Sequence, residues 1–359
     1  MFVIFLIFTF IAKLHAVDQE CSIGGLQGTC QPISTCSKVM SMLTDSDINF
    51  CQEDEPELYI CCPEFLPTSS PVEQDENPSS ISVKKCAEYY PPAKFGVATV
   101  GGTKSLPKQF PHMALLGFGP EEDKQWLCGG SLISYNFVLT AAHCLRSTEF
   151  GEVKWVHLGD LDISTDKDDA EPQDFKIIRA IAHPNYTFSL KYHDIALLQL
   201  DRNAVLTEYV GIACLHTVKN IDDPYDNMTA CGWGKVGFAE EQSNFLLNVR
   251  LNEMDTETCN LLYNDVKKKF LPEGVDGDTM ICAGGEIGVD TCEGDSGGPL
   301  QVKNKLKYGN GKGFTIVGIT SFGKACGITR TPSIYTRVSY YVDWIESIVW
   351  PNEYKMAHS

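Results

Sequence analysis

The chain has 359 residues, enough for two domains, at least one of them with a sizeable core. Hydrophobic residues make up 43% and charged residues 21%, the balance of an ordinary globular protein. The formal net charge of −18 argues against nucleic acid or an anionic membrane surface as a partner, because both carry negative charge.

The chain opens with a short apolar stretch, residues 2–12, followed by Lys13-Leu14-His15-Ala16. This stretch is too short to cross a bilayer, and its place at the extreme N-terminus is typical of a signal peptide. We predict a signal peptide at residues 1–16 and a secreted, extracellular protein. Fifteen cysteines agree with an oxidising compartment, and no later segment is long and apolar enough to predict a membrane helix.

Residues 21–62 form a short segment that is dense in cysteine. So few residues bury too little apolar surface for stability, so we expect disulfides to hold the segment together. A zinc site is the alternative, but the segment has no histidine and the adjacent Cys61-Cys62 pair fits no common ligand spacing. Six cysteines allow fifteen pairings, and the spacing alone does not choose among them. They are Cys21, Cys30, Cys36, Cys51, Cys61 and Cys62.

A change of composition follows. Residues 63–85 are rich in proline, serine and acidic side chains, which predicts an extended, mobile linker. From Thr99 onward, short apolar runs alternate with Gly, Pro, Asn and Asp, which predicts an all-β barrel architecture. Residues 341–350 have helical spacing. The predicted strands include residues 113–118, 131–140, 195–200, 314–321 and 333–338.

Three motifs in this region carry residues suited to nucleophilic catalysis. An apolar run delivers His143 at its end, Asp194 comes just before another run, and Ser296 lies in Gly294-Asp295-Ser296-Gly297-Gly298-Pro299. Taken singly, they also fit a core histidine, a turn aspartate and a surface turn. A serine nucleophile needs a base and N–H donors for the oxyanion, and the flanking glycines permit a tight turn that presents such donors. The order His, Asp, Ser is one of the known chain orders of a catalytic triad.

Together these motifs resemble the trypsin/chymotrypsin family of serine proteases over about residues 99–350, and the cysteine-rich segment resembles the clip domain of arthropod serine proteases. The resemblance implies a fold of two six-stranded antiparallel barrels with the triad between them and a C-terminal helix. It implies a clip domain at residues 21–62, a linker and activation segment at residues 63–98, and a protease domain at residues 99–359.

By this resemblance Ser296 is the nucleophile of a serine endopeptidase, His143 the general base and acid, and Asp194 the residue that orients His143. The amides of Gly294 and Ser296 are expected to form the oxyanion hole. None of these steps requires a metal ion or another cofactor.

The resemblance also implies the specificity. Asp290 corresponds to the floor of the pocket for the residue before the cut bond, where a carboxylate favours Arg or Lys. An exposed loop aspartate is the alternative. Gly323 is expected to keep the mouth of this pocket open. Ser333 stands where glycine is usual in trypsin, so we expect it to narrow the pocket.

Activation is expected to differ from the family pattern. The usual Ile-Val-Gly-Gly is Thr99-Val100-Gly101-Gly102 here, and the residue before the implied cut is Ala98 rather than Arg or Lys. In this family the new N-terminal amine pairs with the aspartate before the nucleophile, here Asp295. We therefore predict a zymogen whose activator prefers small or apolar residues, or an unusual activation.

The resemblance implies seven disulfides. Cys231 is expected to be unpaired, because Met228 and Val302 occupy the positions of one familiar pair. The implied pairs are Cys21–Cys61, Cys30–Cys51, Cys36–Cys62, Cys86–Cys214, Cys128–Cys144, Cys259–Cys282 and Cys292–Cys326.

Two surface features complete the predictions. Six acidic residues, among them Asp160 and Glu171, crowd residues 160–171, where some family members bind calcium. A solvated acidic loop is the alternative, and the one we favour. Asn185 and Asn227 are acceptors for N-glycosylation.

These features predict a clip-domain protease of an extracellular cascade in arthropod immunity, melanisation or development, closest to the C-type members. Its expected partners are protein substrates such as downstream zymogens, an upstream activating protease and serpin-type inhibitors. The alternative is a catalytically weak or inactive homologue that acts as a cofactor or docking protein. Such homologues typically lack the serine that is present here, although Thr99 and Ser333 keep that alternative open. A venom protease would differ only in tissue.

Overall fold

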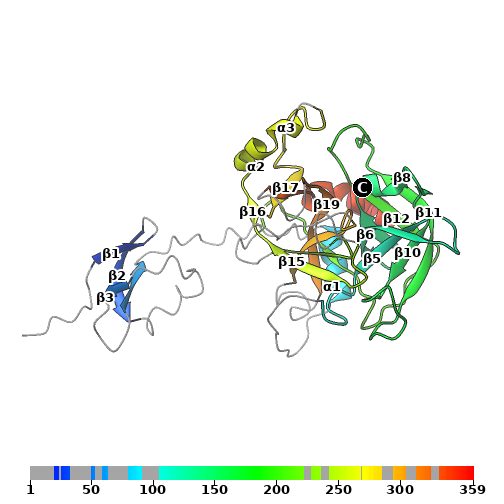
Figure 1. Cartoon of the computed structure of the whole chain (residues 1–359), viewed down its shortest axis with the longest axis horizontal. Coiled ribbons are helices and arrows are strands. Elements are labelled where there is room, and N and C mark those ends of the chain that lie inside the picture. Colours follow the sequence, from blue (N-terminus) through cyan, green and yellow to red (C-terminus); the bar gives the residue numbers. More distant parts are fainter. Residues whose placement is uncertain are drawn as a thin grey trace, which may run out of the picture. The chain divides into compact units, whose positions relative to one another are not determined.

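The computed structural model describes residues 20–23, 26–32, 50–52, 59–63, 80–90, 105–221, 228–235, 242–267, 269–284, 294–304, 313–324 and 331–359. The chain divides into two compact units, Met1–Gln74 and Asp75–Ser359, each described here by itself (Figure 1). The predicted signal peptide lies outside the described residues.

The first unit contains a small antiparallel sheet in the order β1-β2-β4-β3. Its strands are β1 (Glu20–Ile23), β2 (Leu26–Pro32), β3 (Phe50–Gln52) and β4 (Tyr59–Pro63). Cys30 on β2 is buried, lies opposite Cys61 in the register, and is disulfide-bonded. The side chains of the other five cysteines of this segment lie outside the described part, so the three implied pairings stay predictions.

The second unit begins with a closed six-stranded barrel in the order β10-β11-β12-β7-β6-β5. Apolar side chains of its strands fill the interior of the barrel, among them Leu116, Leu132, Val138 and Leu198, each with 0% exposure. A ribbon of β8 (Arg146–Ser147) and β9 (Gly151–Glu152) lies outside the barrel. The barrel strands are β5 (Met113–Phe118), β6 (Gln125–Ser134), β7 (Phe137–Thr140), β10 (Trp155–Leu158), β11 (Gln173–Ala182) and β12 (Ala196–Leu200).

Another eight strands form a second sheet, with β13 pairing in parallel with β19 at its side. The other seven follow the order β15-β14-β18-β19-β20-β17-β16, an open path in place of the second closed barrel that the resemblance implies. Its two end strands are separated in the chain by Asn252 alone, so the sheet is curled and its ends approach each other. The strands are β13 (Cys214–Leu215), β14 (Met228–Gly232), β15 (Leu247–Leu251), β16 (Glu253–Met254), β17 (Met280–Ala283), β18 (Pro299–Lys303), β19 (Phe314–Phe322) and β20 (Ser333–Arg337).

Helices are few and short. The predicted C-terminal helix is present as α4 (Val342–Val349), and α5 (Pro351–Ala357) starts afresh because Pro351 suits a first helical turn. None of the described helices is long and apolar enough to span a bilayer. The others are α1 (Ile81–Tyr89), η1 (Ala142–Leu145), α2 (Thr256–Leu262), α3 (Asn264–Lys267) and η3 (Val338–Tyr341).

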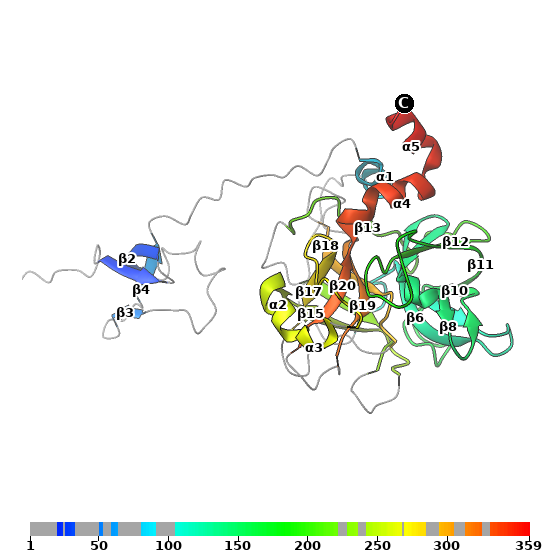
Figure 2. The same cartoon turned by 90° about the horizontal axis from the view of Figure 1, so that it is seen from above.

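The structure corrects the predicted extent of the mobile linker. Helix α1 begins at Ile81, inside the stretch predicted to be extended, and lies beside α4 and β13 (Figure 2). The composition of residues 63–85 did not indicate this helix, because burial of Ile81 and the disulfide from Cys86 fix it through tertiary contacts.

The second unit contains three of the four disulfides implied for it, Cys86–Cys214, Cys128–Cys144 and Cys259–Cys282. Cys292 and Cys326 lie outside the described residues. Cys231 is a buried free thiol whose sulfur accepts a hydrogen bond from Gln301 Nε2 at 2.9 Å. Burial raises the pKa of this thiol well above its ordinary value.

Candidate active site

His143 lies on η1, immediately after strand β7 ends at Thr140. The hydrophobic strand carries the chain to the edge of the barrel core, and buried Ala141 and Ala142 anchor the turn that follows. Cys144, the next residue, is bonded to Cys128 on β6, which fixes this turn against the barrel.

Asp194 precedes β12 and is 1% exposed. Its Oδ2 accepts a hydrogen bond from His143 Nδ1 at 2.7 Å, and its Oδ1 accepts one from the backbone N–H of His143 at 2.9 Å. Ser321 Oγ on β19 also donates to Oδ2, and Thr336 Oγ1 on β20 donates to the backbone carbonyl at 2.8 Å. The carboxylate of the first barrel is therefore also held by the second sheet, and Nε2 of His143 is left to act as a base.

Burial alone would raise the pKa of Asp194. The charge of His143 and the hydrogen bonds from His143 and Ser321 outweigh that effect and hold the pKa below its ordinary value. The aspartate is therefore ionised at neutral pH, the state that stabilises a protonated imidazole.

Ser296 lies on a turn between the two sheets. Its carbonyl accepts a hydrogen bond from Gly129 N on β6 at 2.7 Å, and Gly297 N donates to Thr320 O on β19 at 2.8 Å. Gly294 has φ of +101°, a conformation that favours glycine. The turn is thus fixed from both sides, which gives the serine a defined position.

The disulfide of Cys144 lies between the histidine and the serine. Its Sγ lies 3.7 Å from Nε2 of His143 and 3.5 Å from the carbonyl oxygen of Ser296. The structure therefore joins His143 to Asp194 directly, and the sulfur of Cys144 contacts both the free nitrogen of His143 and the backbone of Ser296.

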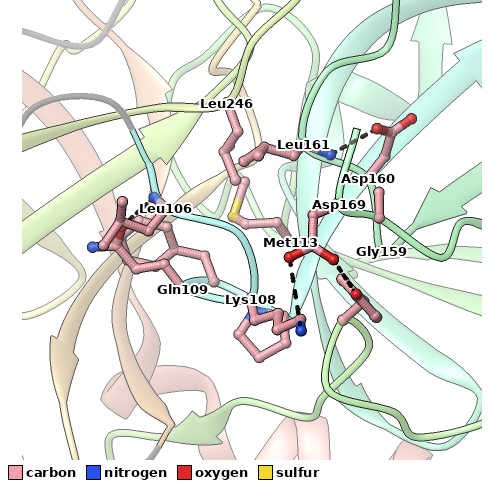
Figure 3. A pocket seen from close by; sticks show the side chains of 13 residues that line it. Leu106, Lys108, Gln109, Met113, Gly159, Asp160, Leu161, Asp169 and Leu246 are labelled. Carbon is pink, nitrogen blue, oxygen red and sulfur yellow. Dashed lines mark hydrogen bonds and ion pairs between the residues drawn. The ribbon is translucent and has the colours of Figure 1, made fainter. Parts of the chain in front are cut away.

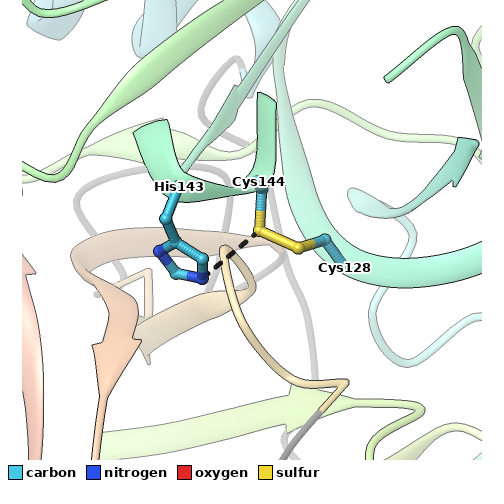
Figure 4. A group of neighbouring side chains, drawn as sticks. All are labelled: Cys128, His143 and Cys144. Atoms are coloured by element: carbon cyan, nitrogen blue, oxygen red, sulfur yellow. Dashed lines mark hydrogen bonds between the residues drawn. A yellow bond between two sulfur atoms is a disulfide. The ribbon is translucent and has the colours of Figure 1, made fainter. Parts of the chain in front are cut away.

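Cys128, His143 and Cys144 also lie close enough together to suggest a metal site (Figure 4). Both sulfurs belong to one disulfide, so neither is a thiolate, the form of cysteine that binds metals. These residues do not fit a metal ion.

The predicted pocket residues are partly described. Ser333 is 1% exposed, and a Cβ added at Gly323 would lie 2.6 Å from its Oγ, so the two residues are in direct contact. Asp290, Ala98, Thr99 and Asn227 lie outside the described residues. Asn185 is exposed. Asp295 accepts a hydrogen bond from Gly234 N at 2.8 Å.

Several of the acidic residues in 160–171 have contacts of their own with other groups. Asp160 contacts His157 at 2.7 Å, and Lys108 lies 3.7 Å from Asp169. Among the described residues, no three of these carboxylates converge on one point. A shallow pocket lies beside this loop, with Lys108, Gln109, Met113, Leu161 and Leu246 in its wall, and it includes none of the predicted catalytic residues (Figure 3).

Comparisons with known proteins agree with this geometry. The family model described as Trypsin matches residues 99–345. The chain is 38% identical over 295 residues to the serine protease snk of Drosophila melanogaster, covering 80% of this chain and 64% of that protein. It is 32% identical to the CLIP domain-containing serine protease B10 of Anopheles gambiae, covering 95% of this chain and 96% of that protein. It is 29% identical to phenoloxidase-activating factor 1 of Holotrichia diomphalia, covering 97% and 98%.

The match to the trypsin family and to serine proteases over most of the chain defines a serine endopeptidase, and the hydrogen-bonded pair of His143 and Asp194 agrees with that class. The chain belongs to the trypsin family, and within it to the clip-domain serine proteases.

Proposed function

We propose that the chain is a secreted zymogen of an extracellular protease cascade that, once cut, cleaves protein substrates after Arg or Lys. The observation that carries the catalytic part of this proposal is the buried, ionised Asp194 hydrogen-bonded to His143. The backbone of Ser296 lies against the Cys128–Cys144 disulfide, which also contacts His143.

The mechanism follows from this arrangement. Ser296 attacks the scissile carbonyl while Nε2 of His143 takes its proton, and His143 then protonates the leaving amine. Asp194 holds the ring with Nδ1–H toward itself and stabilises the imidazolium. Water then attacks the acyl enzyme by the same route, and none of these steps requires a metal ion.

The backbone N–H groups of Gly294 and Ser296 are proposed to bind the oxyanion. Within the described residues, neither N–H donates to a protein acceptor, whereas Gly297 N donates to Thr320 O on β19 and Gly298 N donates to Asp295 O in the turn. Two free donors on one fixed turn are what a developing oxyanion needs, and each is worth about 3 kcal/mol in such sites.

Asp290 is proposed to pair with the Arg or Lys side chain of the substrate. The contact between Ser333 and Gly323 supports the expectation that Ser333 narrows the entrance to that pocket. A cut between Ala98 and Thr99 is proposed to activate the zymogen by freeing an amine for Asp295.

The cascade role is supported by the names of the relatives, which include phenoloxidase-activating factor 1 and melanization protease 1. We propose downstream zymogens as substrates, with an upstream protease as activator and serpin-type inhibitors as regulators. Secretion follows from the predicted signal peptide, and exposed Asn185 suits glycosylation.

The test is the processed enzyme with and without Ser296→Ala. We expect the unchanged enzyme to react with an active-site serine label and to cut a peptide library after Arg or Lys. Ser296→Ala should remove both the label and the cleavage, because no other group forms the acyl enzyme. Activity above a few per cent in that variant, or a preference for large aromatic residues, would contradict the proposal. An unlabelled, inactive processed chain would favour the docking-protein alternative.

A further inference from the structure

Glu346 on α4 is a buried carboxylate that is bound by a distant segment of the same unit. It is 5% exposed, and its Oε1 accepts hydrogen bonds from Ser80 Oγ at 2.6 Å, Ser82 Oγ at 2.6 Å and Ser82 N at 2.8 Å. Within the described part of the chain no basic side chain pairs with it. A buried carboxylate is costly unless donors surround it, so these three bonds are its main compensation.

The rest of the segment, residues 80–90, adds contacts of other kinds. Ile81 is 4% exposed and belongs to the main hydrophobic core. Tyr89 packs edge-on against Tyr135 at 5.8 Å, and the Tyr90 hydroxyl donates to the carbonyl of Ile212. In Figure 2 the helix of this segment, α1, lies beside α4, in agreement with these bonds. The segment is thus built into the protease unit by apolar and polar contacts, in addition to the disulfide of Cys86.

These contacts matter because the segment precedes the proposed cut at Ala98–Thr99. We propose that residues 80–90 form a docking element that holds the N-terminal chain on the protease unit without the Cys86–Cys214 disulfide, with Glu346 as its anchor. The inference rests on the proposed function only in that the activating cut separates the N-terminal chain from the protease chain. Under reducing conditions the processed enzyme then keeps its N-terminal chain.

The experiment separates the docking from the natural activation. In the full chain carrying Ser296→Ala, Cys86→Ser and Cys214→Ser, a recognition sequence for a site-specific protease replaces residues 92–98. After cleavage, gel filtration at micromolar concentration measures whether the N-terminal chain stays bound. We expect it to co-elute, and Glu346→Ala to weaken its affinity about tenfold or more, since hydrogen bonds to a charged group are lost.

The matched control is Glu353→Ala. Glu353 is a half-buried carboxylate on the neighbouring helix α5 and lies 3.4 Å from Lys85 of the same segment. This carboxylate is reached by solvent and makes one ion pair to the segment at 3.4 Å, where Glu346 accepts three short hydrogen bonds, so we expect the change to alter the affinity by about twofold at most. Release of the N-terminal chain with Glu346 intact, or equal retention with Glu346→Ala and Glu353→Ala, would overturn the proposal.

A second measurement covers the case in which Glu346→Ala does not fold. Glu346→Gln keeps the volume of the side chain in the uncut, disulfide-bonded protein. Hydrogen exchange should show faster exchange over residues 80–90 while the closed barrel keeps its protection, and unchanged exchange in the segment would also overturn the proposal. Failure of the serine label on processed enzyme would count against the proposed function and leave the docking result as measured.

Discussion

At the scale of single residues, Asp194 shows how far the sequence could predict the site. The motifs predicted His143, Asp194 and Ser296 because each stands beside a distinctive run of residues. They did not predict that Ser321 and Thr336 bind Asp194, since a serine or threonine in an apolar strand has no local signature. These hydroxyls come from β19 and β20, which pair in the second sheet, and they reach Asp194 only because that sheet packs against the end of the first barrel.

Ser321→Ala tests the role of this hydroxyl. The change removes one donor from Asp194, so the pKa of the carboxyl should rise toward its ordinary value and the ring of His143 should be held less firmly. We expect kcat/KM to fall about threefold to tenfold and the free energy of unfolding to fall by about 1 kcal/mol.

The control for this prediction is Ser164→Ala. Ser164 also donates its hydroxyl to an aspartate, Asp162, but in the exposed acidic loop. Its removal should leave kcat/KM unchanged. Equal kinetics for the two variants would show that Ser321 does not position Asp194.

At the scale of elements, a histidine fastens the acidic loop to the barrel. His157 on β10 contacts Asp160 through Nε2 at 2.7 Å and Asp174 on β11 through Nδ1 at 2.6 Å. Burial lowers the pKa of His157, but the two carboxylates outweigh it and raise the pKa to about 9. At neutral pH the protonated ring of His157 therefore lies between the carboxylates of Asp160 and Asp174, and supplies the positive charge that a bound cation would otherwise supply there.

The raised pKa predicts a pH dependence of stability. The imidazolium is favoured more in the folded than in the unfolded protein, so its contribution is full below about pH 6.5 and is lost as pH rises through about 9. Asp174 is half exposed, so we expect a modest loss of about 1 to 3 kcal/mol over that interval. Thermal unfolding of His157→Gln should lack this loss between pH 6.5 and 9. A parallel decline in the unchanged protein and the variant would contradict the assignment.

The strands of the barrel and of the second sheet could be predicted from the sequence more closely than the turn between β6 and β7 or the helix α1. Alternating apolar runs predicted β5 at its observed bounds and β19 to within one residue, because burial on a barrel imposes them directly. The run at residues 131–140 is two strands, β6 and β7, joined at Tyr135-Asn136, a turn that an apolar run conceals. Helix α1 depends on distant partners such as Glu346 and was predicted as linker for that reason.

At the scale of the whole molecule, the proposed activation involves the segment around residues 98–102, which departs from the family pattern, and the turn that carries Asp295. The implied new terminus is Thr99, where the family has isoleucine, and the residue before it is Ala98. Asp295, the expected partner of the new amine, lies against β14 and the glycine that follows it, with Gly234 N donating to its carboxylate.

We predict that the processed chain begins at Thr99. Thr99→Ile should strengthen the active state by about 1 kcal/mol, because the added apolar group gains burial. A protease that prefers small residues should activate the zymogen well, and trypsin poorly. N-terminal sequencing alongside the serine label measures both. A processed chain that begins elsewhere, or full activity of the uncut protein, would contradict this account.

Cys231 has a consequence for how this protein can be observed. Its thiol is 3% exposed and has a raised pKa. While the second sheet is fully folded, an alkylating reagent therefore finds neither an accessible sulfur nor a thiolate. Labelling must wait for an opening of the sheet that carries β14. The rate at which Cys231 is labelled in the native protein therefore reports how often the second sheet opens locally around β14.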